Sequence, residues 1–146
     1  MLNELAFAAG IVALCVVIHT VGVVILAEWL LDRRATFERR PDMMRFTLLL
    51  IMVFTIILLL HMAEAAIWAA FYQWQELFPN YESSLYFSLT SYSTIGYGDV
   101  LLPQRWRLLG CIEGISGVLL CGLSTALIFV VVNAMIQIRM QPQTRS

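Results

Sequence analysis

Three long apolar segments, at residues 5–31, 46–71 and 106–138, constrain this chain more than any other feature. Each exceeds the roughly 20 residues that a helix needs to cross the hydrocarbon core of a bilayer, at about 1.5 Å rise per residue. Only 13% of the residues are charged, whereas a soluble domain carries about 25%. The chain is therefore predicted to be an all-α, multi-pass membrane protein with three transmembrane helices.

The first apolar segment is predicted to be a retained helix and not a cleaved signal peptide. It is preceded by Asn3 and Glu4 where a signal peptide has basic residues, and its apolar run is too long. The three cysteines, Cys15, Cys111 and Cys121, lie in apolar segments without CxxC spacing. They are predicted to be small buried side chains with no disulfide or metal role.

The positions of the nine basic residues, all arginine, predict the orientation in the membrane. Seven lie in residues 33–45 or in the C-terminal tail, and two, Arg105 and Arg107, lie on the other side. The positive-inside rule then places residues 33–45 and the C-terminus in the cytoplasm and the N-terminus outside the cytoplasm, in a cell (inner or plasma) membrane. An aromatic belt is expected at the outer boundary, made of Trp68, Tyr72, Trp74, Tyr81 and Trp106.

Residues 72–105 are too polar to cross a bilayer and too apolar for an ordinary loop. Pro79 and Asn80 break the chain, and Ser83 or Ser84 is predicted to cap a helix of about two turns, half a membrane in length. The sequence STIGYGDV follows at 93–100. Irregular backbone at membrane depth is tolerated only where protein buries it or water reaches it. A re-entrant loop that lines a water-filled path is therefore predicted.

The glycine spacing in this loop predicts its backbone. Gly96 and Gly98 can adopt positive φ freely, and alternating them with ordinary residues turns successive carbonyl oxygens to one side. Such oxygens can replace the water shell of a monovalent cation, with the hydroxyl of Thr94 added below. Ile95 and Tyr97 are expected to point away and to brace the strand from behind.

The hexapeptide TIGYGD (94–99) resembles the signature filter of the potassium-channel pore-domain family, and the resemblance covers residues 46–135. The chain looks like a small single-pore channel of the prokaryotic type with one additional N-terminal transmembrane helix. The resemblance implies a homotetramer of fourfold symmetry, in which Asp99 is the outer-mouth acid. It also implies K⁺ coordination by the filter, at Thr94, Ile95, Gly96 and Tyr97, with Gly98 completing the coordinating residues.

This reading divides the chain into four parts: an N-terminal transmembrane helix (1–32), a cytoplasmic Arg-rich linker (33–45), the pore domain (46–138) and a cytoplasmic tail (139–146). Within the pore domain we expect an outer helix (46–72), a pore helix (84–93), the filter (94–99) and an inner helix (106–138).

The resemblance implies passive, potassium-selective ion transport. A poorly selective monovalent cation channel is disfavoured by the intact GYG. A subunit of a potassium uptake transporter is disfavoured because such loops usually keep one glycine and appear four times in one long chain. No nucleophile–base pair, phosphate loop or HExxH motif suggests an enzyme. The expected partners are K⁺, the lipid bilayer and further copies of the chain, with no nucleic acid and no cofactor other than the permeant K⁺.

One residue departs from the family pattern. Some members place a glutamate four residues before the filter threonine, where it is bonded to the acid at the mouth. Thr90 occupies that position here, so Asp99 must find another partner.

The third apolar segment carries small residues at helical spacing, namely Gly110, Gly114, Gly117, Cys121 and Ser124. Close helix packing is the first interpretation. The alternative, implied by the family, is a hinge at Gly117 or Gly122. The face expected to line a central cavity contains Leu119, Gly122, Ala126 and Val130.

Four ionisable residues within the predicted spans are candidate functional residues: His19, His61, Glu64 and Glu113. The first interpretation is buried hydrogen bonds, with pore-helix hydroxyls such as those of Ser88 among the partners. A second is pH sensing, because histidine titrates near neutrality. A third, weaker one is a metal site made of His19, His61 and Glu64.

Overall fold

The structure is a computed structural model that describes residues 2–39 and 42–140. It consists of α1 (Leu2–Arg39), α2 (Met43–Trp74), α3 (Tyr81–Tyr92), the short 3-10 helix η1 (Gln104–Trp106) and α4 (Arg107–Met140). No strand occurs among the described residues. Three helices are long and apolar enough to cross a membrane, at Asn3–Arg33, Met43–Trp74 and Gln104–Met140. The expected all-α membrane architecture with three spanning helices is confirmed.

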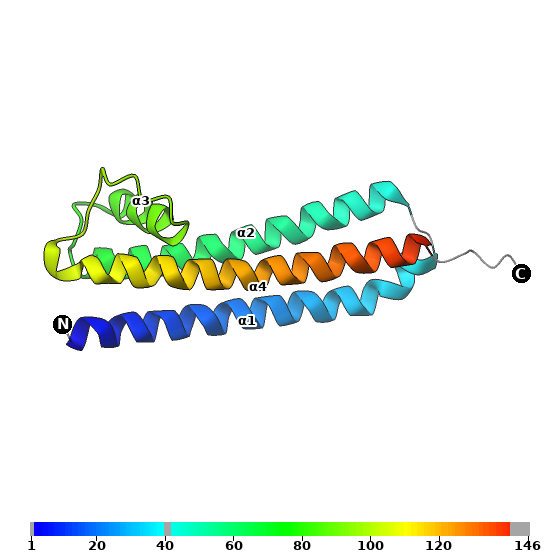
Figure 1. The fold of residues 1–146 in the computed structure, drawn as a ribbon, viewed down its shortest axis with the longest axis horizontal. Coiled ribbons are helices and arrows are strands. Elements are labelled where there is room, and N and C mark those ends of the chain that lie inside the picture. Colours follow the sequence, from blue (N-terminus) through cyan, green and yellow to red (C-terminus); the bar gives the residue numbers. More distant parts are fainter. Residues whose placement is uncertain (1, 40–41, 141–146) are drawn as a thin grey trace, which may run out of the picture.

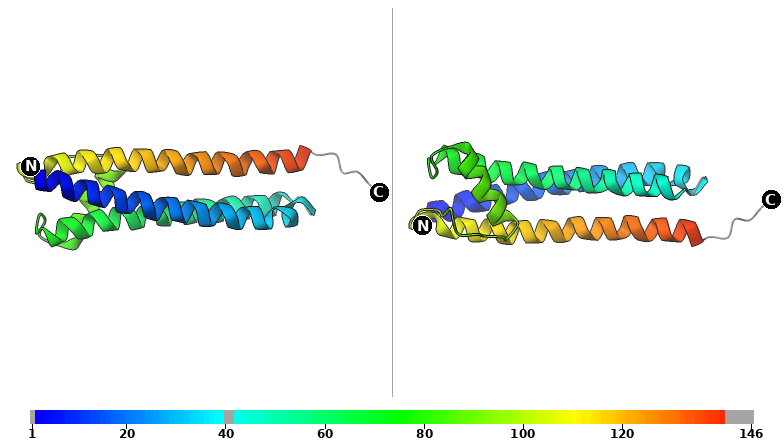
Figure 2. Two further views of the ribbon diagram at one scale, coloured as in Figure 1. Left: turned by 90° about the horizontal axis from the view of Figure 1, so that it is seen from below. Right: turned by 90° about the horizontal axis from the view of Figure 1, so that it is seen from above.

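The three long helices run side by side, and the short helix α3 lies at one end of them (Figure 1). Figure 2 shows α3 crossing one face of the α2–α4 pair, while α1 covers the opposite face. The first residues of α1 lie at the same end as α3, and the start of α2 and the end of α4 lie at the other. Side chains that join α1 to α3 must therefore pass between α2 and α4.

The start of α3 differs from the expectation. The side-chain Oδ1 of Asn80 accepts a hydrogen bond from the Ser83 amide at 2.8 Å, and Asn80 has extended backbone angles. Asn80 is therefore the cap, and the prediction of Ser83 or Ser84 was wrong. The helix begins at Tyr81, three residues before the expected start of the pore helix at 84, because a cap residue precedes the first helical residue.

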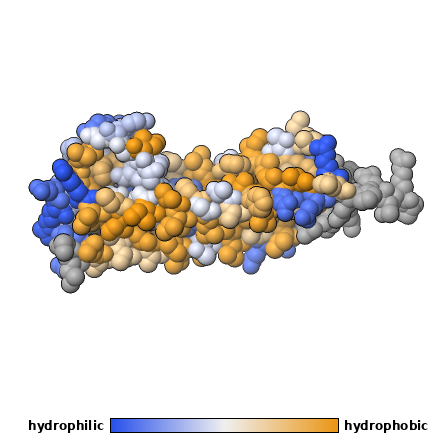
Figure 3. Space-filling model, in the orientation of Figure 1, coloured by the Kyte–Doolittle hydropathy of each residue, from blue (hydrophilic) through white to orange (hydrophobic). Residues whose placement is uncertain are grey.

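The surface agrees with a membrane environment. An apolar band covers the middle of the molecule, and hydrophilic residues collect toward both ends (Figure 3). Large apolar side chains such as Val17, Ile25 and Leu58 are about 60% exposed. A water-soluble protein rarely exposes a continuous apolar surface of this extent. The chain is a multi-pass membrane protein.

Burial corrects two expectations about individual residues. Trp68 and Tyr72 are fully buried in the core at the α3 end, so they do not belong to an aromatic belt, whereas Trp74 is 67% exposed. Cys15 is buried as expected, but Cys111 and Cys121 are exposed. In both cases the face of the helix that packs inward was not evident from hydrophobicity, because every face of these helices is apolar.

Candidate functional site

The helix α3 runs from one end of the helical bundle toward its middle (Figure 2). It has 12 residues and ends at Tyr92, with Ser93 as its C-cap, and the following segment returns without regular structure toward η1 (Figure 2). The helix packs on both α2 and α4. The segment 93–100 thus lies on the face of the α2–α4 pair that α1 does not cover.

The backbone of this segment alternates in the sign of φ. The φ angles of Thr94, Gly96 and Gly98 are +60°, +52° and +78°, and neither Ile95 nor Tyr97 has a positive φ. Alternation of this kind turns successive carbonyl groups toward one side, whereas an extended strand alternates them. The two glycines therefore occupy the positive-φ positions that their spacing predicted.

Sequence reasoning missed the third positive φ, at Thr94. A β-branched residue rarely adopts this region, and doing so costs of order 1–3 kcal/mol. Two hydrogen bonds to the end of α3 hold the backbone there: the Thr94 amide donates to the Ser91 carbonyl at 2.9 Å, and the Gly96 amide donates to the Thr90 carbonyl at 3.0 Å. The loop conformation is therefore fixed by the helix that precedes it.

The side chains of Ile95 and Tyr97 in this segment are largely uncovered in the single chain. Ile95 is 55% exposed and Tyr97 is 71% exposed. The chain itself therefore does not provide the bracing from behind that we expected of these two residues. A hollow on the same face is lined by Thr94, Gly96 and Gly98 together with Cys111 and Ile115 of α4.

Asp99 has a partner within the same chain. The hydroxyl of Tyr86, in the second turn of α3, donates a hydrogen bond to Oδ2 of Asp99 at 2.8 Å. This hydrogen bond to the carboxylate raises the pKa of the Tyr86 phenol above its ordinary value. Tyr86 thus connects the end of the glycine-bearing segment to α3. Thr90 has no carboxylate with which to make the family's usual bond to the acid at the mouth.

A family model described as an ion channel matches residues 54–134, which is more than half of the chain. The chain belongs to this ion channel family. No curated protein and no solved structure matches the chain. The matched residues run from α2 through α3 and the segment 93–100 into α4, so α1 lies outside the channel domain that the family shares.

In this ion channel, glycines of α4 allow α3 to pack closely against α4. A Cβ atom added to Gly114 would lie 3.0 Å from the Ser91 carbonyl oxygen, and one added to Gly117 would lie 2.2 Å from the Tyr92 carbonyl oxygen. An added Cβ at Gly110 would contact the ring of Phe87 at 3.1 Å. This arrangement agrees with the close-packing interpretation of the glycines. A hinge at Gly117 or Gly122 stays a prediction.

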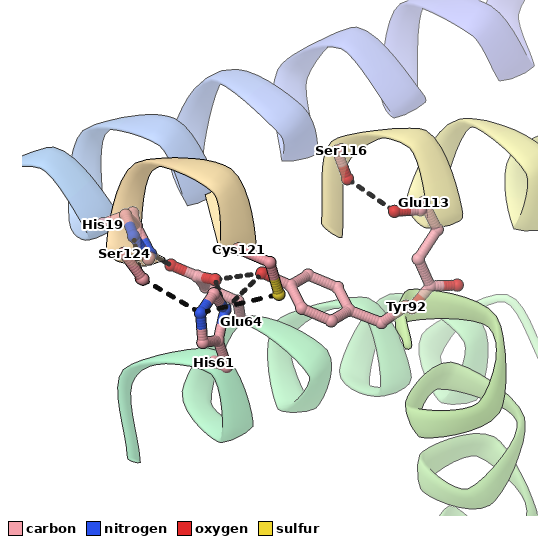
Figure 4. Close-up of polar contacts among 8 residues, drawn as sticks. All are labelled: His19, His61, Glu64, Tyr92, Glu113, Ser116, Cys121 and Ser124. Atoms are coloured by element: carbon pink, nitrogen blue, oxygen red, sulfur yellow. Dashed lines mark hydrogen bonds and ion pairs between the residues drawn. The ribbon is translucent and has the colours of Figure 1, made fainter. Parts of the chain in front are cut away.

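One buried polar cluster joins all four main helices of the channel (Figure 4). His19 of α1 contacts Glu64 of α2, with 2.8 Å between Nδ1 and Oε1. The Tyr92 hydroxyl, at the end of α3, donates a short hydrogen bond to Oε2 of Glu64 and lies 2.9 Å from Nδ1 of His61. The Ser124 hydroxyl of α4 lies 3.0 Å from Nε2 of His19 and 3.2 Å from Nε2 of His61.

A second buried cluster surrounds Glu113 of α4. The Tyr72 hydroxyl donates to Oε2 of Glu113 at 2.7 Å, and the Ser88 hydroxyl donates to Oε1 at 2.5 Å. Ser88 also lies 2.7 Å from the Ala65 carbonyl oxygen. Glu113 therefore accepts a hydrogen bond from a hydroxyl of α3, the hydrogen bonding that the first interpretation of the intramembrane acids expected.

Sequence reasoning named both histidines and both glutamates but missed three partners in these clusters: Tyr72, Tyr92 and Ser124. A tyrosine in an apolar helix gives no local signal of its contact, because that contact comes from a residue far away in the chain. The pH-sensing role suggested for the histidines stays a prediction.

Proposed function

We propose that this ion channel is selective for potassium and conducts it passively through a homotetrameric pore. The observation that carries the proposal is the alternating φ across Thr94–Gly98, directly after a half-length helix. Stacked rings of backbone carbonyl oxygens are how potassium channels replace the hydration shell of the ion. The C-terminal end of α3 points toward the first of these residues, and its dipole favours a cation there.

The proposed coordinating residues are Thr94, Ile95, Gly96, Tyr97 and Gly98, with Asp99 at the outer mouth. One subunit offers a single set of carbonyl oxygens, so a closed ring requires further copies around an axis. The exposed Ile95 and Tyr97 side chains and the hollow beside α4 support this assembly, since a neighbouring subunit can cover them. A lone subunit would leave polar backbone against lipid, which is costly.

The proposed setting is a cell membrane with the α3 end outside the cytoplasm. Arg33, Arg45 and Arg139 lie toward the end of the bundle opposite α3, and Arg105 and Arg107 lie at the α3 end. Arginine excess favours the cytoplasmic side. The additional helix α1 would then cross the membrane with its N-terminus outside.

The test is potassium and sodium flux into liposomes that contain the purified protein, for wild type and for Gly96→Ala. Gly96 has a φ of +52° and no atom within 4 Å of an added Cβ, so alanine there is disfavoured by the backbone and not by lack of space in the subunit. Gly10→Ala in α1 is the matched control, because that glycine also has no atom within 4 Å and has no positive φ.

We expect wild type and Gly10→Ala to pass potassium far faster than sodium, and Gly96→Ala to lose flux or selectivity. Equal potassium and sodium flux in wild type would favour the poorly selective channel. Flux that saturates at low potassium concentration would favour the transporter subunit. A monomer in native mass spectrometry would contradict the tetramer.

A further inference from the structure

We propose that His19, His61 and Glu64 form a binding site for a divalent metal ion of the zinc class, inside the membrane and next to the pore helix α3. The three residues come from α1 and α2, and the site lies between α2 and α4 (Figure 4). Neither potassium conduction nor the channel family assigns such a site to this chain.

The donor atoms suit such an ion. Two imidazole nitrogens and a carboxylate oxygen are ligands that Zn²⁺ commonly takes in proteins. One ligand atom from each of the three residues lies within 4.8 Å of the other two. Bonds of about 2.0–2.1 Å in a tetrahedral site place ligands about 3.4 Å apart. The three side chains must therefore adjust on binding, because the closest pairs, at 2.8 and 3.3 Å, lie nearer than this and the 4.8 Å limit is wider.

The two histidines are oriented so that their Nδ1 atoms face the carboxylate. His19 Nδ1 lies 2.8 Å from Oε1 of Glu64, and His61 Nδ1 lies 3.3 Å from Oε2. The imidazole rings are 4.9 Å apart between centroids. A metal ion placed between these three groups could bind both Nδ1 atoms and a carboxylate oxygen at once.

Ser124 supplies the supporting contact that metal-binding histidines usually have. Such a histidine donates its other ring N–H to an acceptor, which fixes its tautomer and orientation. Here the Nε2 atoms of His19 and His61 lie 3.0 and 3.2 Å from the same Ser124 hydroxyl oxygen. That oxygen has two lone pairs, so it can accept from both N–H groups. Without a metal, each Nδ1 faces an acceptor, either the Glu64 carboxylate or the Tyr92 hydroxyl oxygen, and donates its N–H to it. Binding therefore requires both rings to move this proton to Nε2, and both Nδ1 lone pairs are then free for the metal.

Burial and access also agree with a bound ion. His19 and Glu64 are fully buried, and the side chain of His61 keeps 14% of its surface exposed. The part of the site that the single chain leaves open is therefore at His61. The Glu64 carboxylate supplies one negative charge, and the Tyr92 hydroxyl, 2.9 Å from His61 Nδ1, is the nearest candidate for a fourth ligand.

The site is connected to the ion path through Tyr92. The Tyr92 hydroxyl donates to Oε2 of Glu64, one of the oxygens that the metal would use. Tyr92 is also the last residue of α3, two positions before Thr94. A bound metal thus changes the contact that anchors the end of α3, and we expect it to lower the flux of the channel. This consequence for flux, unlike metal binding itself, rests on the proposed function.

The first experiment measures binding and needs no transport. The tag-free protein, with Asp99→Asn to remove the exposed acid at the mouth, is titrated with Zn²⁺ by calorimetry and with Co²⁺ by visible absorption. We expect one ion per subunit and the intense bands of tetrahedral Co²⁺. His19→Ala and His61→Ala should abolish both signals, and Ser124→Ala should weaken binding by about 10–100-fold. No saturable binding in the parent protein would overturn the proposal.

Two controls test where the ion lies. Glu113→Gln removes the buried carboxylate of α4 and should leave binding unchanged, whereas Glu64→Gln, in α2, should abolish it. Cys121→Ser should also leave binding unchanged, because its sulfur lies 3.8 Å from Nε2 of His61, the ring nitrogen that is not assigned to the metal. Loss of binding in Glu113→Gln or Cys121→Ser, with tetramers intact by size-exclusion chromatography, would contradict the assigned ligands.

The second experiment adds Zn²⁺ to liposomes during flux. Wild type should slow on addition of the ion and recover with a chelator, while His19→Ala, which changes a helix outside the channel domain, should not respond. Binding without any effect on flux would keep the metal site and refute the coupling through Tyr92. Failure of potassium selectivity would leave the binding result intact.

Discussion

The contact between Gly117 of α4 and the end of α3 gives the sharpest test of how this channel is held together. A Cβ added to Gly117 would lie 2.2 Å from the Tyr92 carbonyl oxygen, and real Cβ atoms essentially never approach closer than 3.0 Å. Gly117→Ala must therefore move one backbone by at least 0.8 Å, which is 3.0 minus 2.2. Overpacking of this kind costs about 1–3 kcal/mol.

Gly122→Ala is the matched control for this substitution. It lies in the same helix and has no atom within 4 Å of an added Cβ. Both variants gain the same helix propensity, about 1 kcal/mol, so the difference between them isolates the clash with Tyr92. We expect Gly117→Ala to be about 1–3 kcal/mol less stable than Gly122→Ala.

The assay compares the melting temperature of the protein in detergent and potassium flux in liposomes for the two variants. Gly117→Ala should melt lower and should lose flux, because Tyr92 is two residues before Thr94 and the displacement reaches the proposed filter. Equal melting temperatures combined with reduced flux would instead support a hinge at Gly117 and refute the packing argument.

Two further predictions concern Tyr86 of α3 and its N-cap, Asn80. Tyr86→Phe removes the hydrogen bond to Asp99 and should give faster loss of current during sustained conduction, whereas Tyr81→Phe, an exposed tyrosine on the same helix, should behave as wild type. The hydrogen bond to Asp99 raises the pKa of Tyr86, so its stabilising effect should be fully present below the ordinary pKa of tyrosine. It should be lost only as the pH rises through the raised pKa. The difference in current loss between Tyr86→Phe and wild type should therefore vanish in strong alkali. Asn80→Ala should lower the stability of the protein by about 1 kcal/mol in thermal melts, and Ser83→Ala should not. A larger loss of stability in Ser83→Ala would show that Ser83, and not Asn80, caps the helix.

Much of the fold could be predicted because it depends on local composition. Length and hydrophobicity set three spanning helices, and Pro79 and Asn80 interrupt the chain where the structure ends α2 and starts α3. The choice of cap could not be predicted as well. Asn80, Ser83 and Ser84 are all good cap residues, and the backbone entering α3 decides which of them is used.

The inward faces of the helices were harder to predict. In a helix that is apolar all round, the hydrophobic pattern does not show which side packs against protein. Trp68 and Tyr72 are therefore buried where an interfacial position was expected, and Cys121 is exposed where burial was expected. These assignments depend on which neighbour each helix meets.

The sequence by itself determined the membrane setting and the two positive-φ glycines of the candidate filter, because span length and the glycines at 96 and 98 act within a few residues. The positive φ of Thr94 depends instead on hydrogen bonds to the end of α3. Only the tertiary structure decided that His19 contacts Glu64, 45 residues away, and that Gly117 packs against the end of α3. Contacts of this kind depend on how whole helices cross, and no local pattern of residues encodes the crossing.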